Sequence, residues 1–112
     1  MSRDEAILLD VARALRLIVE FTRDLDAGMF FEDIKTQSAV LHQLLVLGEA
    51  VKRLSPVFRS THPEIPWSLI AGMRDNLIHE YDSVDLEEVW RTVQRDVPHL
   101  LHLLDPFLPP SE

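Results

Sequence analysis

Apolar residues recur along the first quarter of the chain at the three- and four-residue spacing of an α-helix, with charged residues between them. Ser2 followed by Glu5 forms a capping-box pattern, which predicts that this helix begins at Ser2. Gly28 follows the last apolar position and is expected to end the helix. The apolar positions are Ile7, Val11, Leu15, Ile18 and Leu25.

A second helical pattern covers residues 33–54 and is apolar on nearly two sides in its middle, which predicts burial against more than one neighbour. Gly48 lies within this pattern, where glycine costs about 1 kcal/mol relative to alanine. We expect the close approach of another helix to compensate for that cost. Ser55 and Pro56 then provide an N-cap and a proline at the first helical position, which predicts a short helix to about His62.

A predicted break at residues 81–84 separates the remaining two helices. Residues 67–78 carry helical spacing in their apolar positions. A last helix begins at Asp85, which forms a second capping-box pattern with Glu88, and it extends to about Leu104. Because Pro98 lies inside this pattern, we expect a kink or a junction there.

These elements predict an all-α fold, an up-and-down bundle of four main helices and one short helix, because short connections make sequential helices antiparallel neighbours. We expect a single helical domain over residues 1–105 and a proline-rich tail over residues 106–112. A homodimer is the accompanying hypothesis, since the apolar excess of the second and fourth main helices is easier to bury between two copies.

Composition narrows the classes of function. Eleven Lys and Arg against nineteen Asp and Glu give the 112 residues a formal charge of -8, which excludes a generally basic nucleic-acid-binding surface but not a small basic site. The lack of cysteine excludes disulfides, a thiolate nucleophile and cysteine-ligated zinc. Apolar runs are far shorter than the roughly 20 residues of a membrane span, and the charged N-terminus lacks a signal-peptide core. A cytoplasmic protein is therefore expected.

Chemistry-bearing side chains are concentrated in residues 73–81, at the end of one helix and in the break after it. Arginine binds phosphate through paired hydrogen bonds, and histidine transfers protons near neutral pH. Arg74 and His79 are five positions apart, which places them roughly 140° apart around a regular helix. They converge only if the helix end unwinds, if the long arginine reaches round, or if two copies meet. A structural interpretation also stands, in which Arg74 pairs with Asp75 and His79 interacts with the helix dipole.

The pattern Arg-x4-His-x-Tyr, formed by Arg74, His79 and Tyr81, resembles the signature of HepT-like toxins of the HEPN superfamily. Flanking residues match that family in the same order, so the resemblance covers essentially the whole chain. One position departs from the family pattern, because asparagine is frequent where this chain has Asp75. A carboxylate there is expected to pair with Arg74 and to weaken its hold on phosphate. The matching flanks are Gly48-Glu49-Ala50, Ile65-Pro66-Trp67, Gly72-Met73-Arg74, Val84-Asp85 and Val89-Trp90.

The resemblance implies a HEPN-like helical-bundle homodimer in which two copies of the motif line a shared cleft. It implies an endoribonuclease that uses no metal or other cofactor, with RNA as substrate and neither DNA nor a membrane as partner. By analogy, Arg74 holds the scissile phosphate, and His79 is the general acid or base while the ribose 2′-hydroxyl attacks phosphorus. A cognate minimal nucleotidyltransferase is the implied antitoxin, which transfers AMP to Tyr81 and blocks RNA by bulk and negative charge.

Glu49 and Asp75 are the supporting candidates beside this motif. Glu49 is expected to lie on a well-buried helix, so it needs a cationic partner. Two interpretations remain open for Glu49: it orients Arg74 or His79, or it forms an ordinary ion pair between helices.

Other charged and titratable residues have two interpretations each. Lys52, Arg53 and Arg59 either form a local patch that holds RNA weakly or complement a helix dipole. His99 and His102 stand three positions apart, but no third and fourth ligand accompany them, so no metal site is expected. For the whole protein, the alternatives to a nuclease are a non-catalytic helical partner that presents nucleotide or substrate to a nucleotidyltransferase and a plain helical dimerisation module.

Overall fold

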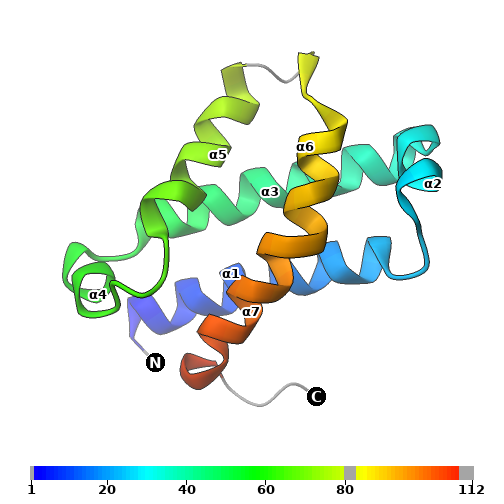
Figure 1. Ribbon diagram of the computed structural model, residues 1–112. Helices are drawn as coiled ribbons and strands as arrows, with labels where there is room; N and C mark the ends of the chain where they lie inside the picture. The colour runs from blue at the N-terminus through cyan, green and yellow to red at the C-terminus, as the bar shows by residue number, and fades with distance from the viewer. Residues whose placement is uncertain (1, 80–82, 109–112) are drawn as a thin grey trace.

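The structure, a computed structural model, describes residues 2–79 and 83–108, with the backbone alone given for Asn76, Ile78 and His79. No strand occurs in these residues, and the predicted all-α bundle is confirmed (Figure 1). The elements in chain order are α1 (Arg3–Thr22), α2 (Ala27–Glu32), α3 (Ile34–Arg53), α4 (Pro56–Thr61), α5 (Trp67–His79), α6 (Leu86–Arg91), the π-helical segment η2 (Thr92–Asp96), α7 (Val97–Leu104) and the 3-10 turn η3 (Asp105–Phe107).

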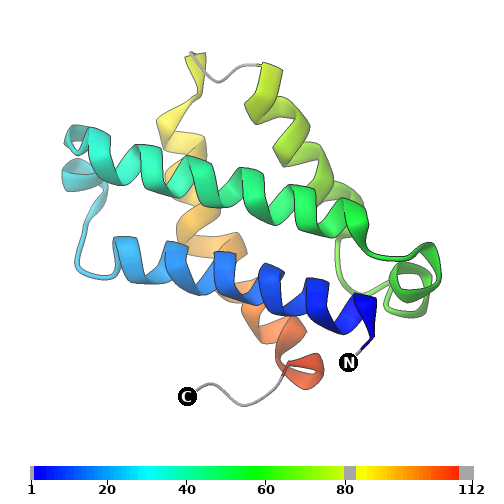
Figure 2. The ribbon, with the colours of Figure 1, turned by 180° about the vertical axis from the view of Figure 1, so that it is seen from behind.

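The helices form two layers. The antiparallel pair α1 and α3 makes one layer, and α5 together with the arm formed by α6, η2 and α7 crosses it on the other side (Figures 1 and 2). Figure 2 shows α1 and α3 side by side in front of the second layer. Apolar side chains from both layers make one core, whose largest fully buried members include Leu15, Ile18, Phe30, Leu47 and Ile70. None of the described helices is both long and apolar enough to span a bilayer.

Helix starts agree with the capping signals in the sequence. Ser2 accepts a hydrogen bond from the backbone N–H of Glu5 at 3.1 Å, as the first capping-box pattern predicted. Ser55 caps α4 in the same way and also donates a hydrogen bond through its hydroxyl to Asp4 at 2.7 Å. This bond holds the corner between α3 and α4 against the start of α1. Asp85 caps α6, so the second predicted start is also confirmed.

The expectation that Gly28 ends the first helix is wrong. Helix α1 ends at Thr22, whose hydroxyl donates a hydrogen bond back to the carbonyl of Ile18 at 2.8 Å. Gly28 lies in the first turn of a further short helix, α2, capped by Asp26. This helix forms because it buries Phe30 completely in the core, so tertiary packing outweighs the glycine. Two short helices, α2 and α4, therefore connect the described long helices α1, α3 and α5, where the sequence predicted one.

Pro98 marks a junction in the last helical arm, as predicted. Helix α6 widens into the π-helical segment η2 before α7 begins, and Pro98 lies in the first turn of α7. Proline has no backbone N–H and its ring clashes with the carbonyl four residues earlier, so the regular hydrogen-bond ladder cannot run through it. The wider turn accommodates this clash without ending the arm.

The first residues of the predicted tail are packed rather than free. Phe107 in η3 contacts His62 with ring centroids 4.3 Å apart and Phe58 with centroids 6.3 Å apart. The end of the described chain thereby covers α4 and the loop after it. The domain limits at residues 1–105 and 106–112 stay a prediction.

Candidate active site

Arg74 lies where α5 crosses α3, directly over Gly48. A Cβ atom built on Gly48 would lie 2.1 Å from the Cβ of Arg74 and 3.3 Å from its Cα, so only glycine permits this crossing. The close approach predicted from Gly48 is confirmed, and the approaching helix carries the Arg-x4-His pattern. The base of the Arg74 side chain is thus fixed by backbone packing, while 27% of the side chain stays exposed.

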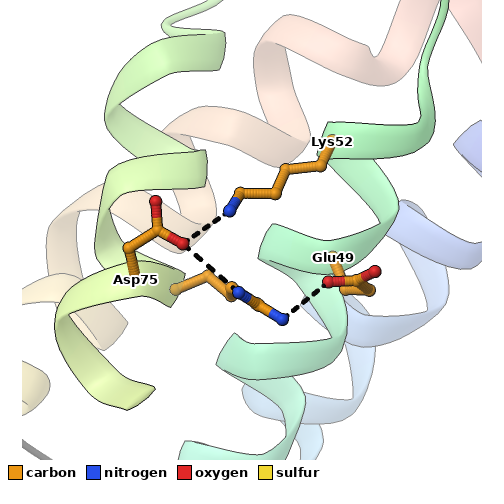
Figure 3. Close-up of polar contacts among 4 residues, drawn as sticks. Glu49, Lys52 and Asp75 are labelled. Atoms are coloured by element: carbon orange, nitrogen blue, oxygen red, sulfur yellow. Dashed lines mark hydrogen bonds and ion pairs between the residues drawn. The ribbon is translucent and has the colours of Figure 1, made fainter. Parts of the chain in front are cut away.

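Four charged side chains form a chain of ion pairs at this crossing (Figure 3). The Nη2 of Arg74 lies 3.0 Å from Oε2 of Glu49, and its Nη1 donates a hydrogen bond to Oδ1 of Asp75 at 3.3 Å. Lys52 donates a hydrogen bond through Nζ to the same Asp75 oxygen. The cationic partner expected for Glu49 is therefore Arg74, and the expected pairing of Asp75 with Arg74 is present. The roles of Glu49 and Asp75 in function stay predictions.

The predicted burial of Glu49 is wrong. Its side chain is 53% exposed, although Gly48 and Ala50 on either side are buried. Neighbouring positions on a helix point about 100° apart, so Gly48 faces α5 while Glu49 turns to the rim of the crossing. Because Glu49 is solvated, its pair with Arg74 is weak, and an incoming anion can displace the carboxylate at small cost.

A hollow of about 470 Å³ adjoins Arg74 on the outer face of α3. Arg53 lies in it, whereas Lys52 points to Asp75. Arg59 lies on α4, and its Nε is buried without a hydrogen-bond partner in the described residues. The predicted basic group of Lys52, Arg53 and Arg59 therefore does not form one patch, because its three members face different surroundings. The residues around the hollow are His42, Leu45, Val46, Glu49, Arg53 and Arg74.

Helix α5 stays regular to its last residue, His79. The unwinding that would turn His79 toward Arg74 therefore does not occur within α5. On this helix the two residues lie roughly 140° apart around the axis and about 7.5 Å apart along it. A long reach by Arg74 or a second copy of the motif remains as the way to bring them together. The prediction for Tyr81 lies outside the described residues.

Comparison with known proteins identifies the family of this chain. A family model described as "Ribonuclease HepT-like" matches residues 11–106. This chain belongs to the ribonuclease HepT-like family. The resemblance inferred from Arg74, His79 and Tyr81 is thereby confirmed at the level of the family.

Ribonuclease HepT-like relatives match most of this chain. It is 48% identical over 93 residues to a probable ribonuclease HepT of Thermococcus cleftensis, covering 83% of this chain and 84% of the relative. It is 40% identical over 94 residues to a putative RNase of Methanocaldococcus jannaschii, covering 84% and 78%. A putative RNase of Caldanaerobacter subterraneus is 34% identical over 100 residues, with 89% of each chain covered. No solved structure matches the chain.

A separate apolar hollow, of about 340 Å³, lies between α5 and α6, and Arg74 is not among its lining residues. Its floor is apolar, with Leu44 and Met73 among its lining residues, and its rim carries the carboxylates of Asp85, Glu88 and Asp96. Three carboxylates repel a phosphate, so this hollow does not suit the RNA backbone that the family name points to. The hollow beside Arg74 is the better candidate for the active site of this ribonuclease HepT-like protein.

Within the described residues, the histidines outside the motif belong to no group of three or more possible metal ligands. His99 and His102 are both exposed on α7, and no group of three or more His, Asp or Glu residues able to hold a metal occurs in the part of the chain that is described. His42 is exposed beside the hollow at Arg74, and His62 is packed between Phe58 and Phe107.

The pairing of Lys52 with Asp75 was not predicted from the sequence. The sequence does contain two pairs of charges that could have indicated it. Glu49 and Lys52 stand three positions apart on one face of α3, and Arg74 and Asp75 on α5 have charges opposite to Glu49 and Lys52, respectively. Only the crossing at Gly48 brings these two pairs together, and the sequence does not state which helix crosses there.

We expect the chain of ion pairs to make stability depend on pH below the ordinary pKa of aspartate. The hydrogen bond from Lys52, and then that from Arg74, lowers the pKa of Asp75. Its contribution is complete above the unfolded pKa of about 3.9 and is lost as pH falls through the lower folded pKa. In denaturant unfolding, Asp75→Asn should lose less stability than wild type as the pH falls below about 4. An equal loss in both proteins would show that Asp75 carries no such linkage.

Proposed function

We propose that this protein is an endoribonuclease that needs no metal ion, with Arg74 and His79 as its catalytic residues. Membership of the ribonuclease HepT-like family supports an RNA-cleaving activity. The observation that carries the assignment of the site is the position of Arg74, which is anchored over Gly48 and presents its guanidinium at the edge of a hollow. Such a fixed, partly exposed cation suits a phosphate whose charge grows during reaction.

In the proposed reaction, the 2′-hydroxyl of one ribose attacks the phosphorus of the adjacent phosphodiester. His79 acts as general base or acid, removing the proton of the attacking hydroxyl or protonating the departing 5′-oxygen. Arg74 replaces its contact with Glu49 by two hydrogen bonds to the non-bridging oxygens and stabilises their charge. The products are a 2′,3′-cyclic phosphate and a 5′-hydroxyl. DNA lacks the 2′-hydroxyl and is not a substrate for this route.

A homodimer completes the site in this proposal. The separation of positions 74 and 79, roughly 140° around the regular helix α5, supports a pairing of Arg74 from one subunit with His79 from the other. A twofold axis beside the crossing of α3 and α5 places two copies of the motif in one cleft, as an isologous interface requires.

The test is incubation of purified protein with RNA in the presence of excess EDTA. We expect cleavage with 2′,3′-cyclic phosphate ends, and we expect growth arrest on expression that either Arg74→Ala or His79→Ala relieves. RNA that stays intact in EDTA, together with variants that behave like wild type in cells, would overturn the nuclease and favour a non-catalytic partner of a nucleotidyltransferase.

We further propose that the protein is the toxin of a toxin–antitoxin pair and that a minimal nucleotidyltransferase neutralises it by transferring AMP to Tyr81. The modification brings bulk and negative charge close to the cations that bind RNA. Incubation with ATP and a cognate minimal nucleotidyltransferase should add the mass of one AMP to wild type and none to Tyr81→Phe. A gain that persists in Tyr81→Phe would refute this residue as the acceptor, and no gain in wild type would refute the modification.

A further inference from the structure

The hollow beside Arg74 continues into a second one on the same face of the molecule. The second hollow, of about 240 Å³, lies between α1 and α3 and shares Val46 and Arg53 with the first. The two hollows adjoin at Val46 and Arg53 on α3, one on the side of Arg74 and the other on the side of α1, and together they are called the groove below. The residues that only the second hollow adds are Asp10, Arg13, Ala14, Leu17 and Gln43.

The α3 side of this groove is a single helical face. His42, Val46, Glu49 and Arg53 stand at relative positions 0, 4, 7 and 11, and eleven residues span about 16 Å of helix. Arg53 therefore lies one turn beyond Glu49, the residue that pairs with Arg74, along a continuous strip of surface. A chain that enters at Arg74 meets Arg53 next along this strip.

The groove is more positive than the rest of the molecule. It contains Arg13, Arg53 and Arg74 against Asp10 and Glu49, a local excess of one positive charge on a chain of formal charge -8. The two carboxylates are loosely held: Arg53 and Asp10 are 3.5 Å apart, with side chains 49% and 58% exposed. Exposed pairs of this kind contribute little, so phosphate oxygens can replace both carboxylates.

We infer that this groove binds the single-stranded RNA that flanks the cleavage point, with Arg53 and then Arg13 contacting backbone phosphates beyond the one held by Arg74. The inference rests on the proposed ribonuclease function and extends it to the path of the substrate. Arginines on an open groove contact phosphates, which carry no sequence information, and the apolar side chains between them accept any base. None of the residues that line the two hollows is Phe, Tyr or Trp, so the groove gives affinity with little preference for base.

The test separates binding from cleavage by using a 2′-O-methyl oligonucleotide of about 16 nucleotides, which lacks the attacking hydroxyl. The double variant Arg13→Ala/Arg53→Ala is compared with Arg23→Ala/Arg91→Ala, which has the same net charge. Arg23 and Arg91 lie outside the groove, in exposed pairs with Glu20 and Glu88. Both double variants lose only exposed side chains, and thermal unfolding checks that they stay folded.

We expect the groove variant to bind the oligonucleotide about tenfold more weakly than the control variant at low salt. Each phosphate contact to a single strand contributes about 0.7 to the slope of log affinity against log salt, so removal of two contacts should lower that slope by about 1.4. With cleavable RNA, the groove variant should raise KM more than it lowers kcat.

Equal affinities and equal salt slopes for the two double variants would overturn the inference and leave the nuclease proposal intact if wild type still cleaves RNA. Binding with the expected slopes but no cleavage in wild type would instead overturn the nuclease and retain the strand-binding groove. A change in oligomeric mass, by light scattering, in the groove variant alone would overturn the inference by showing that this face is an interface between copies.

Discussion

Arg74→Ala is expected to lower the rate of RNA cleavage by about 10²–10³-fold, the loss seen when one group that stabilises developing negative charge is removed. The fold should survive this change. Alanine keeps the Cβ that packs over Gly48, and Asp75 keeps its hydrogen bond from Lys52. The exposed pair with Glu49 is worth at most about 1 kcal/mol. The measurement is the single-turnover cleavage rate, with the thermal unfolding midpoint recorded for the same preparations.

Two further variants show whether the loss belongs to the chemistry. Arg23→Ala removes a cation from an exposed pair with Glu20 and should cleave RNA at the wild-type rate. Arg74→Lys keeps the charge but loses the planar fork that holds two phosphate oxygens, so its rate should fall between those of Arg74→Ala and wild type. Cleavage by Arg74→Ala at the rate of Arg23→Ala would mean that Arg74 is an ordinary surface arginine.

Gly48→Ala is expected to destabilise the protein by about 1–3 kcal/mol, the usual cost of an added carbon in a closely packed contact. The new Cβ would lie 2.1 Å from the Cβ of Arg74 and 3.3 Å from its Cα, so α3 and α5 must move apart. A shift of the backbone is unavoidable because the near atoms lie at the base of the side chain. For a domain of this size, each kcal/mol lowers the unfolding midpoint by roughly 4–8 °C.

Gly72→Ala is the matched control for this effect. Gly72 also lies in a helix, on α5, but a Cβ there has no neighbour within 4 Å. Alanine at Gly72 should therefore leave stability unchanged or raise it by up to about 1 kcal/mol through helix propensity. Cleavage should fall in Gly48→Ala even below its unfolding temperature, because Arg74 moves with α5. A midpoint for Gly48→Ala that is no lower than that of Gly72→Ala would contradict the tight crossing.

The sequence predicted the parts of the fold that local chemistry determines. Capping residues such as Ser2 and Asp85 predicted helix starts, because a cap acts within one element. Gly48 predicted that another helix approaches closely, but not which one. Gly28 was misinterpreted because its local preference for ending a helix is weaker than the burial of Phe30 two residues later. That burial depends on the other layer of the bundle, which a single element does not encode.

The candidate site was predicted to a similar depth. The Arg-x4-His-x-Tyr motif predicted Arg74 as a site residue. The structure adds that Arg74 packs over Gly48 and contacts Glu49, both on another helix. The burial of Glu49 was predicted wrongly because most of α3 is buried, whereas Glu49 lies at the exposed edge of the crossing with α5. The groove through Arg53 joins three helices and could not be found before their packing was known.

Cleavage by the proposed route requires Arg74 and His79 to act on one phosphodiester, although their positions lie roughly 140° apart around the axis of α5. Mixing Arg74→Ala with His79→Ala protein, after exchange of subunits, tests this directly. If the pair is completed across two subunits, each mixed dimer has one intact site of two. Random exchange of equal amounts makes about half of the dimers mixed, so the cleavage rate should recover to about a quarter of wild type. If the mixture stays as inactive as either variant alone while light scattering shows that mixed dimers form, the proposed shared site is contradicted.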